Sequence, residues 1–349
     1  MSHRRGALAT LGVAVVLLTS PREGFAFHEK GVASCETCHT PHDSRDGLPT
    51  GSFIPSEWGL LKSSPSDLCL SCHADLQGAV LGRSLLLPPP EMGGGNFVFL
   101  REDNLNDALE GGMDPIPGDA AGHNLVAPEH GLDSDPRYSF SPGGSFSSQQ
   151  MGCTSCHDPH GNDSFRMLNG VGPVQNGSFV FADPAPDAEG VALNSAGESR
   201  VNHSAYRQGV SRWCGNCHGR YHEDGLTGFE HPVEGLFGGA EQDQYEQYDG
   251  DDNPTGGMAT SAYLSEVPFE DPLATTDSIS GPSASSRVMC LSCHRAHASS
   301  APAAGRWDFN VAVVEDDGVV SGSYPIPNPY RTQGQGSLCR KCHKSGTGD

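Results

Sequence analysis

Every cysteine of this chain lies in a C-x-x-C-H segment, in which two residues separate a pair of thiols and a histidine follows directly. The six copies are CETCH at 35–39, CLSCH at 69–73, CTSCH at 153–157, CGNCH at 214–218, CLSCH at 290–294 and CRKCH at 339–343. This spacing is typical of covalent haem attachment, in which the thiols bond to the two vinyl groups and the histidine binds the iron. The sequence therefore predicts six haem c groups, which we number with their motifs from 1 to 6.

The predicted cofactor residues follow from the motifs. The haem-attaching cysteines are Cys35, Cys38, Cys69, Cys72, Cys153, Cys156, Cys214, Cys217, Cys290, Cys293, Cys339 and Cys342. The proximal iron ligands are His39, His73, His157, His218, His294 and His343. Paired cysteines in an exported chain also occur in disulfide frameworks and in zinc knuckles. Neither alternative needs a histidine after every second cysteine, a pattern that composition alone would give with a probability on the order of 10⁻⁸.

Three motifs carry a second histidine three positions after the proximal one, namely His42, His160 and His297. On a helical turn, residues three apart project from nearly the same face. The second histidine therefore cannot reach the distal side of its own haem. We expect it to bind the iron of a neighbouring haem and to draw two haems into a stacked pair.

Nine histidines of the exported chain lie outside the motif positions, which is enough to give each iron a second histidine. The predicted distal ligands are His28, His42, His123, His160, His231 and His297, with His222 in reserve; His130 and His203 are the other two. Ligation by two histidines would keep the irons six-coordinate and at lower potentials than histidine and methionine together.

The composition fits a chain that packs around cofactors. Glycine and proline make up 71 of 349 residues, and aromatic residues only 7%, so six apolar macrocycles would supply the burial that side chains do not. We expect a mostly irregular fold, with short helices at the haem motifs and a few short strands around an extended haem stack. The net charge of −22 makes nucleic acid a poor partner and favours basic redox proteins or other multihaem cytochromes.

The amino-terminal segment 1–26 has two arginines, a short apolar run and small residues at its end, as in a secretory signal peptide. Its apolar run is shorter than a bilayer-spanning helix, so no membrane segment is expected in the exported chain. The cytochrome region would then be 27–349, with haem doublets at about 27–120, 121–235 and 236–349. We expect the protein at the outer-membrane surface or outside the cell, otherwise in the periplasm.

The segments between the motifs are rich in turn residues. Loops are expected at 88–95 and 141–145, and short strands at 97–100 and 179–181 with a hairpin over 311–322. The acidic segment 241–257 is expected to be solvated; its carboxylates could hold calcium, although their spacing differs from an EF-hand loop. No nucleotide-binding or hydrolase motif is evident.

Segment 27–44, FHEKGVASCETCHTPHDS, resembles the mature amino terminus of the OmcS-type hexahaem cytochromes of metal-reducing bacteria, which form filaments. Other segments resemble secreted multihaem cytochromes with doubled motifs: GHNLVAPEHGL (122–132), CTSCHDPHG (153–161), YRQGVSRWCGNCHGRYH (206–222), HPVEG (231–235) and VMCLSCHRAHASS (288–300). The resemblance implies a nearly continuous stack of bis-histidine haems, little regular secondary structure and electron transfer across the outer membrane or beyond the cell. It also implies that one distal histidine comes from the next subunit, at the position of His42.

These patterns predict an electron carrier of extracellular or periplasmic respiration rather than an enzyme, with a homopolymer or a mineral among its partners. A reductase for a small nitrogen or sulfur compound would need one iron with an open coordination site. That alternative remains open at the level of sequence, as does a structural secreted protein without haem.

Overall fold

The computed structural model describes residues 35–39, 44–45, 48–49, 61, 63–74, 80–82, 92–101, 105–106, 115–116, 118–174, 177–191, 197–219, 233–251, 253, 255–309, 311–314 and 329–344. The predicted signal peptide lies outside these residues, as do His28, His42, His222 and His231. No helix in this part of the chain combines the length and the apolar composition of a membrane span.

Short helices carry the haem motifs, as the sequence predicts. They are α2 (Cys35–Cys38), α4 (Pro65–His73), α5 (Cys153–Cys156), α6 (Val210–His218), α8 (Cys290–Cys293) and the 3₁₀ helix η11 (Leu338–Lys341). Helix α4 begins where the Ser64 hydroxyl accepts a hydrogen bond from the backbone N–H of Asp67, with a proline in the first turn. Helices α5 and α8 are single turns, because the histidine that follows each has an extended backbone.

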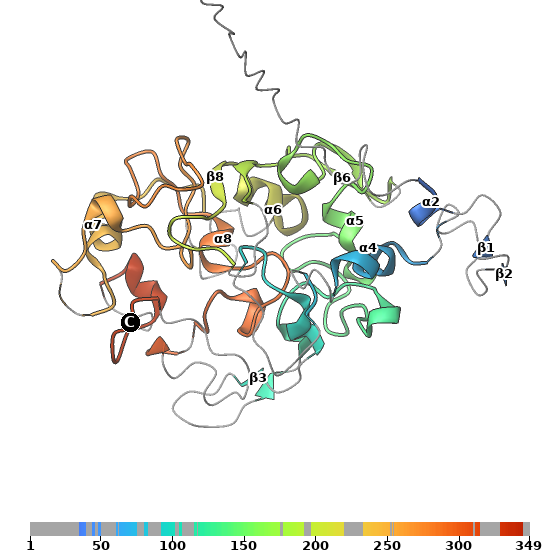
Figure 1. Cartoon of the computed structure of the whole chain (residues 1–349), viewed down its shortest axis with the longest axis horizontal. Helices are drawn as coiled ribbons and strands as arrows, with labels where there is room; N and C mark the ends of the chain where they lie inside the picture. The colour runs from blue at the N-terminus through green and yellow to red at the C-terminus, as the bar shows by residue number, and fades with distance from the viewer. Residues whose placement is uncertain are drawn as a thin grey trace, which may run out of the picture.

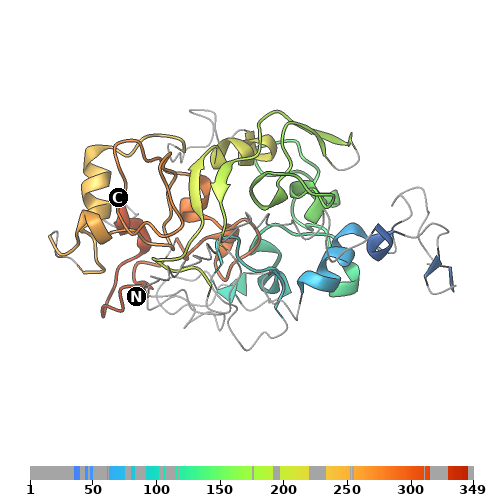
Figure 2. The same ribbon diagram turned by 45° about the horizontal axis from the view of Figure 1, so that its top comes forward.

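The motif helices follow the long axis of the molecule in chain order (Figure 1). Helix α2 lies at one end, α4 and α5 come next, α6 and α8 lie nearer the middle, and the carboxy-terminal η11 lies at the other end beside α7 (Gly239–Gln247). The turned view in Figure 2 keeps this order, from blue at one end to red at the other. The described attachment motifs therefore form an extended series, as a haem stack requires.

The remaining regular structure is sparse. The other 3₁₀ helices are η1 (Phe97–Arg101), η2 (Gly118–Ala120), η3 (Pro128–His130), η4 (Ser148–Gln150), η5 (Phe165–Met167), η8 (Ala259–Ser261) and η9 (Pro302–Ala304). Four antiparallel pairs of strands occur in the described part: β1 (Ser44–Arg45) with β2 (Leu48–Pro49), β3 (Leu105–Asn106) with β4 (Pro115–Ile116), β5 (Gly172–Val174) with β6 (Phe179–Phe181), and β7 (Asp187–Glu189) with β8 (Ala205–Gln208). The predicted coil-rich fold class and the strand at 179–181 are thus confirmed.

The predicted strand at 97–100 is wrong, because this segment is helix η1. The side-chain oxygen of Asn96 accepts hydrogen bonds from the backbone N–H groups of Val98 and Gly82 and so turns the chain. Residues 97–99 are all buried, instead of alternating between two faces. In the predicted hairpin, Val313 forms a bridge with Gly336 from the carboxy-terminal segment, and residues 315–322 lie outside the described part.

The expectation of a solvated segment at 241–257 is wrong at Tyr245, which lies in α7 with the residues around it. Tyr245 is fully buried there, and its hydroxyl donates to the carbonyl of Val267 at 2.7 Å. The apolar side chain of one tyrosine therefore fixes an otherwise polar helix to the fold.

Buried apolar side chains form three separate clusters among the described residues. The first gathers around Leu70 and Phe97, the second around Tyr245 and Trp307, and the third around Tyr206. Partly buried motif cysteines pack against two of them: Cys293, Cys339 and Cys342 in the second cluster, and Cys214 in the third. The apolar surface thus lies next to the thiols that would attach haem.

Candidate haem-attachment sites

The eleven cysteines whose side chains the structure describes are free thiols, and each motif lies close to the next. A hydrogen bond between the thiols of Cys69 and Cys153 raises the pKa of Cys69, and the charge of Cys38 acts in the same direction. Motifs 1, 2 and 3 are therefore neighbours in space.

The second half of the chain repeats this arrangement. A hydrogen bond with Cys290 raises the pKa of the Cys214 thiol, to which Cys156 is also electrostatically coupled. Burial raises the pKa of Cys293 to about 12, and Cys342 and Cys339 add to the effect. The thiols thus link motif 3 to motif 4, motif 4 to motif 5 and motif 5 to motif 6.

Three of the predicted proximal histidines are oriented by backbone carbonyl groups. The Nδ1 atom of His157 lies 2.8 Å from the carbonyl oxygen of Arg166, that of His218 lies 2.8 Å from Pro142, and that of His294 lies 2.9 Å from Ala303. A carbonyl oxygen only accepts, so Nδ1 carries the proton and Nε2 keeps its lone pair. This tautomer is the one that a metal-binding imidazole adopts, and the hydrogen bond makes Nε2 a stronger donor.

Three pairs of imidazole rings lie next to each other in the described structure, and each pair includes one histidine of a C-x-x-C-H motif. The rings of His39 and His160 have centres 6.4 Å apart and are inclined by 12°. Those of His157 and His297 are 6.5 Å apart and inclined by 63°. Two imidazoles on opposite sides of one metal, each bonded at about 2.0–2.1 Å, have ring centres roughly 6–6.5 Å apart. Both pairs therefore have the spacing that an iron between them needs.

The third pair is His123 and His218, with ring centres 5.8 Å apart. Their Nε2 atoms face each other at 3.5 Å, and the Nδ1 atom of His123 lies 2.8 Å from the carbonyl oxygen of Ala296. Burial, together with the charge of His218, lowers the pKa of His123 to about 4. His123 is thus held neutral with its Nε2 directed at Nε2 of His218, which is the protonation state that binds a metal.

His297 is also held neutral. Burial, followed by the charges of His157 and His123, lowers the pKa of His297 to about 3. Burial lowers the pKa of His157 as well. Burial therefore favours the neutral, metal-binding form of both rings at motif 3.

His130 and His203 have other partners. The Nδ1 atom of His130 lies 2.9 Å from Oδ1 of the buried Asp67. Both ring nitrogens of His203 face backbone carbonyls, those of Ser204 at 3.0 Å and Ser278 at 2.9 Å. His203 is thus built into the backbone network, while His130 belongs to a carboxylate cluster.

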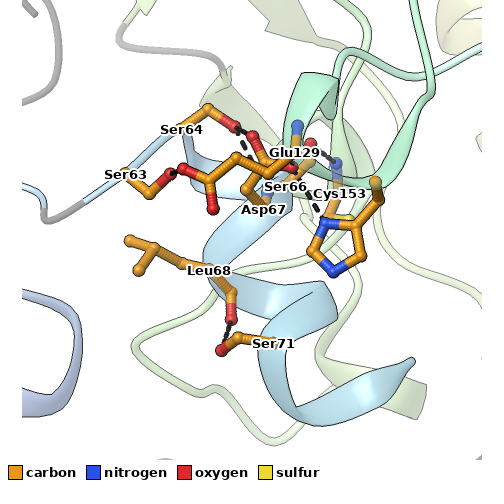
Figure 3. Close-up of polar contacts among 9 residues, drawn as sticks. Ser63, Ser64, Ser66, Asp67, Leu68, Ser71, Glu129 and Cys153 are labelled. Carbon is orange, nitrogen blue, oxygen red and sulfur yellow. Dashed lines mark hydrogen bonds and ion pairs between the residues drawn. The ribbon is translucent and has the colours of Figure 1, made fainter. Parts of the chain in front are cut away.

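That cluster joins the amino-terminal turn of α4 to η3 and to the start of α5 (Figure 3). Oδ2 of Asp67 accepts from the hydroxyl of Ser64 at 2.5 Å, and Oδ1 accepts from the backbone N–H of Glu129 at 3.1 Å. The hydroxyl of Ser66 accepts from the backbone N–H of Cys153 at 3.3 Å. Motif 3 is therefore hydrogen-bonded to the helix that carries motif 2.

The carbonyl partners of the proximal histidines were not predicted from the sequence. Backbone acceptors leave no trace in residue types, and Pro142 lies far from His218 in the chain. The pairing of His160 with His39, and of His297 with His157, was also not predicted. The three-residue spacing showed only that each second histidine cannot bind the iron of its own motif's haem.

The similarities to known proteins agree with this geometry. The family described as having a doubled CXXCH motif matches residues 28–78 and 146–177. These matches, the coil-rich fold and the serial motifs define a multihaem c-type cytochrome, a protein with covalently bound haem c that carries electrons.

The chain is similar to the C-type cytochrome OmcS of Geobacter sulfurreducens, as the sequence predicted. The two are 29% identical over an alignment that covers 97% of this chain and 99% of OmcS. Two solved structures have the same fold: OmcS nanowires from Geobacter sulfurreducens by cryo-EM, with a TM-score of 0.71 and 28% identity, and the outer membrane cytochrome S filament from the same organism, with 0.73 and 27%. Each comparison covers 91% of this chain and 100% of the other.

Proposed function

We propose that this protein is a six-haem electron conduit in which every iron is bound by two histidines. The twelve motif cysteines attach the haems, and His39, His73, His157, His218, His294 and His343 are the proximal ligands. Within the chain, His160 serves haem 1, His297 serves haem 3 and His123 serves haem 4. The observation that carries this assignment is the three facing imidazole pairs, each of which includes one proximal histidine.

For haems 2 and 6 we assign His28 and His231, with His222 in reserve. Both ring nitrogens of His203 face backbone carbonyls, so His203 is set aside. His130 uses only Nδ1 for Asp67, which leaves its Nε2 available as a further candidate. The contacts between thiols of successive motifs support electron transfer in chain order from haem 1 to haem 6.

Assembly into a filament explains the ligand of haem 5. Where a motif has a second histidine, that histidine lies beside the proximal histidine two motifs earlier. His160 of motif 3 lies beside His39 of motif 1, and His297 of motif 5 lies beside His157 of motif 3. His42 belongs to motif 1 and has no earlier motif in its own chain. By the same rule, His42 is the distal ligand of haem 5 in another copy of the chain, where His294 is the proximal ligand. The similar OmcS structures are nanowires and filaments, which supports this proposal.

Replacing His42 by alanine tests the assembly. The His42→Ala variant is expected to leave one haem of six high-spin and to remain unpolymerised in negative-stain electron micrographs. The matched variant His160→Ala removes a ligand within the chain, so it should also give one high-spin haem but still polymerise. Filaments of His42→Ala with six low-spin haems would refute the intersubunit ligand.

The proposed site of action is outside the inner membrane, at the outer-membrane surface or in an extracellular filament. The acidic surface suits basic redox proteins, and other multihaem cytochromes or a mineral would complete the electron path. A reductase function requires an open iron. The electron paramagnetic resonance spectrum of the oxidised, haem-loaded protein, together with its mass, decides between them. Six low-spin haems are expected, whereas a high-spin haem that turns over nitrite, hydroxylamine or tetrathionate would establish the reductase.

A further inference from the structure

Two loops share an unusual backbone, and each follows a motif that has a second histidine, namely motif 3 or motif 5. Loop 157–168 closes through a bridge between His157 and Leu168, and loop 294–305 closes through a bridge between His294 and Gly305. The second histidine is His160 in the first loop and His297 in the second. Each residue of the first loop is separated from its equivalent in the second loop by the same number of residues.

The end of the first loop is a turn with two consecutive left-handed residues. Arg166 has φ 52° and Met167 has φ 55°. The backbone N–H of Leu168 donates to the carbonyl of Phe165 at 3.0 Å across them. Positive φ at both central positions defines a type I′ turn, for which glycine, asparagine and aspartate are the usual residues.

The second loop ends in the same turn. Ala303 has φ 53° and Ala304 has φ 56°, and the backbone N–H of Gly305 donates to the carbonyl of Pro302 at 2.9 Å. Arginine, methionine and alanine all have a Cβ atom that disfavours this conformation. The strain therefore occurs twice, at the same point after a proximal histidine, and such strain persists only where the surrounding structure requires it.

The strained turn presents the carbonyl group that orients the proximal ring. The acceptor for Nδ1 of His157 is Arg166, and the acceptor for Nδ1 of His294 is Ala303, each the first left-handed residue of its turn. His218 of motif 4, which lacks the second histidine at this spacing, instead uses Pro142 from a remote segment. The local turn is thus found at the two described motifs that carry ligands for two haems.

We propose that the left-handed turns at 165–168 and 302–305 are positioning elements that fix the proximal imidazole and, through the closed loop, the relative orientation of two haems. The inference rests on the proposed function, since loop 157–168 carries the proximal ligand of haem 3 and the distal ligand of haem 1. Loop 294–305 does the same for haems 5 and 3. Haem 3 is therefore held between the two loops.

The test uses paired substitutions at Arg166 and Ala303, which are both exposed. Glycine accepts positive φ without strain, whereas a β-branched valine does not. Arg166→Gly and Ala303→Gly are expected to keep the native turn. Arg166→Val and Ala303→Val are expected to flip it and to remove the carbonyl from the proximal ring. Ala312→Val, at an exposed alanine without positive φ, is the control for valine itself.

The measurements are electron paramagnetic resonance and a redox titration of the haem-loaded full chain. Loss of the Nδ1 hydrogen bond makes the imidazole a weaker donor, so one component of the titration should move to higher potential in each valine variant. One low-spin signal should also change its g values, because the ring is free to rotate. Ala303→Gly and Ala312→Val should match the wild type. Arg166→Gly removes a positive charge near His157, so it is the reference against which Arg166→Val is compared.

Valine variants that match the glycine variants at the same positions would overturn the proposal. If a valine variant does not accumulate, the double variant Arg166→Gly with Met167→Gly replaces it: it is expected to keep six haems but broaden one low-spin signal, and unchanged line widths would count against the turn. Failure of the proposed function is distinguishable, because it would appear in the wild type as fewer than six haems.

Discussion

Loops 157–168 and 294–305 have the same backbone but very different surroundings. Loop 294–305 is hydrogen-bonded to two remote segments: His297 N–H donates to the carbonyl of Gly94, and the His297 carbonyl accepts from His123 N–H. Loop 157–168 has its own closing hydrogen bonds, and the side chain of His160 is 80% exposed. The turn therefore depends on the loop itself, while the surroundings decide how firmly the second histidine is held.

Close backbone contact explains why the buried loop is so well fixed. A Cβ atom on Gly122 would collide with the carbonyl of His297, and one on Gly95 would collide with that of Ala298. Gly95 also has φ 78°, a conformation that other residues rarely adopt. Ala298 is fully buried between these glycines. The second loop thus depends on residues from two other parts of the chain.

The largest difference between the loops is expected for their second histidines. His297 stacks on Phe97 with ring centres 4.5 Å apart, so His297→Ala should destabilise the protein by about 2–5 kcal/mol through a cavity. His160→Ala also removes an iron ligand but leaves no cavity, because its side chain is 80% exposed, so it should cost less than His297→Ala by about the cavity cost. Guanidinium unfolding of both haem-loaded variants measures this. Equal losses of stability would show that the two loops are equally anchored.

The two loops also differ in the residue that follows each of them, which is Arg306 after loop 294–305 and Asn169 after loop 157–168. Arg306 is fully buried and donates to four backbone carbonyls, those of Leu291, His294, Ser265 and Gly93. Arg306→Met should cost more than about 3 kcal/mol, because each buried carbonyl left without a donor costs about 1–3 kcal/mol. Removal of a fixed positive charge beside motif 5 should also lower the potential of that haem, since the cation favours the reduced iron. Thermal unfolding and a redox titration check the two effects.

The equivalent of Arg306 after the first loop is Asn169, whose amide donates to the carbonyl of Thr154 at 3.1 Å. Asn169→Ala is expected to cost about 1 kcal/mol for one lost hydrogen bond and to leave the haem potentials unchanged. A drop in potential for Asn169→Ala equal to that for Arg306→Met would mean that the hydrogen bond, not the charge, tunes the haem.

The sequence was sufficient for features that depend on local residue types. The motif helices, the turn at 141–145 and the strand at 179–181 are where they were expected. It was insufficient for features that depend on tertiary contacts. The type I′ turns have none of the usual glycine or asparagine, and helix η1 replaces a strand because Asn96 binds backbone groups on both sides of it.

The smallest expected effect concerns the hydrogen bonds that tie each single-turn helix to the preceding motif helix. Ser66 accepts from the backbone N–H of Cys153 at 3.3 Å, and Ser211 accepts from that of Cys290 at 3.0 Å. Each serine lies three residues before the first cysteine of its own motif, so the two motif pairs are joined in the same way. Replacement of either serine by alanine leaves a helix-terminal N–H without an acceptor and should cost about 0.5–2 kcal/mol.

The shorter bond and the complete burial of Ser211 predict the larger loss for Ser211→Ala. Chemical unfolding of the two variants side by side measures the difference, with the exposed Ser71→Ala on α4 as control. If Ser66→Ala proved the more costly, the anchoring of the first loop would lie in α4 rather than in the loop. The contrast between a buried and an exposed loop would then apply to their second histidines alone.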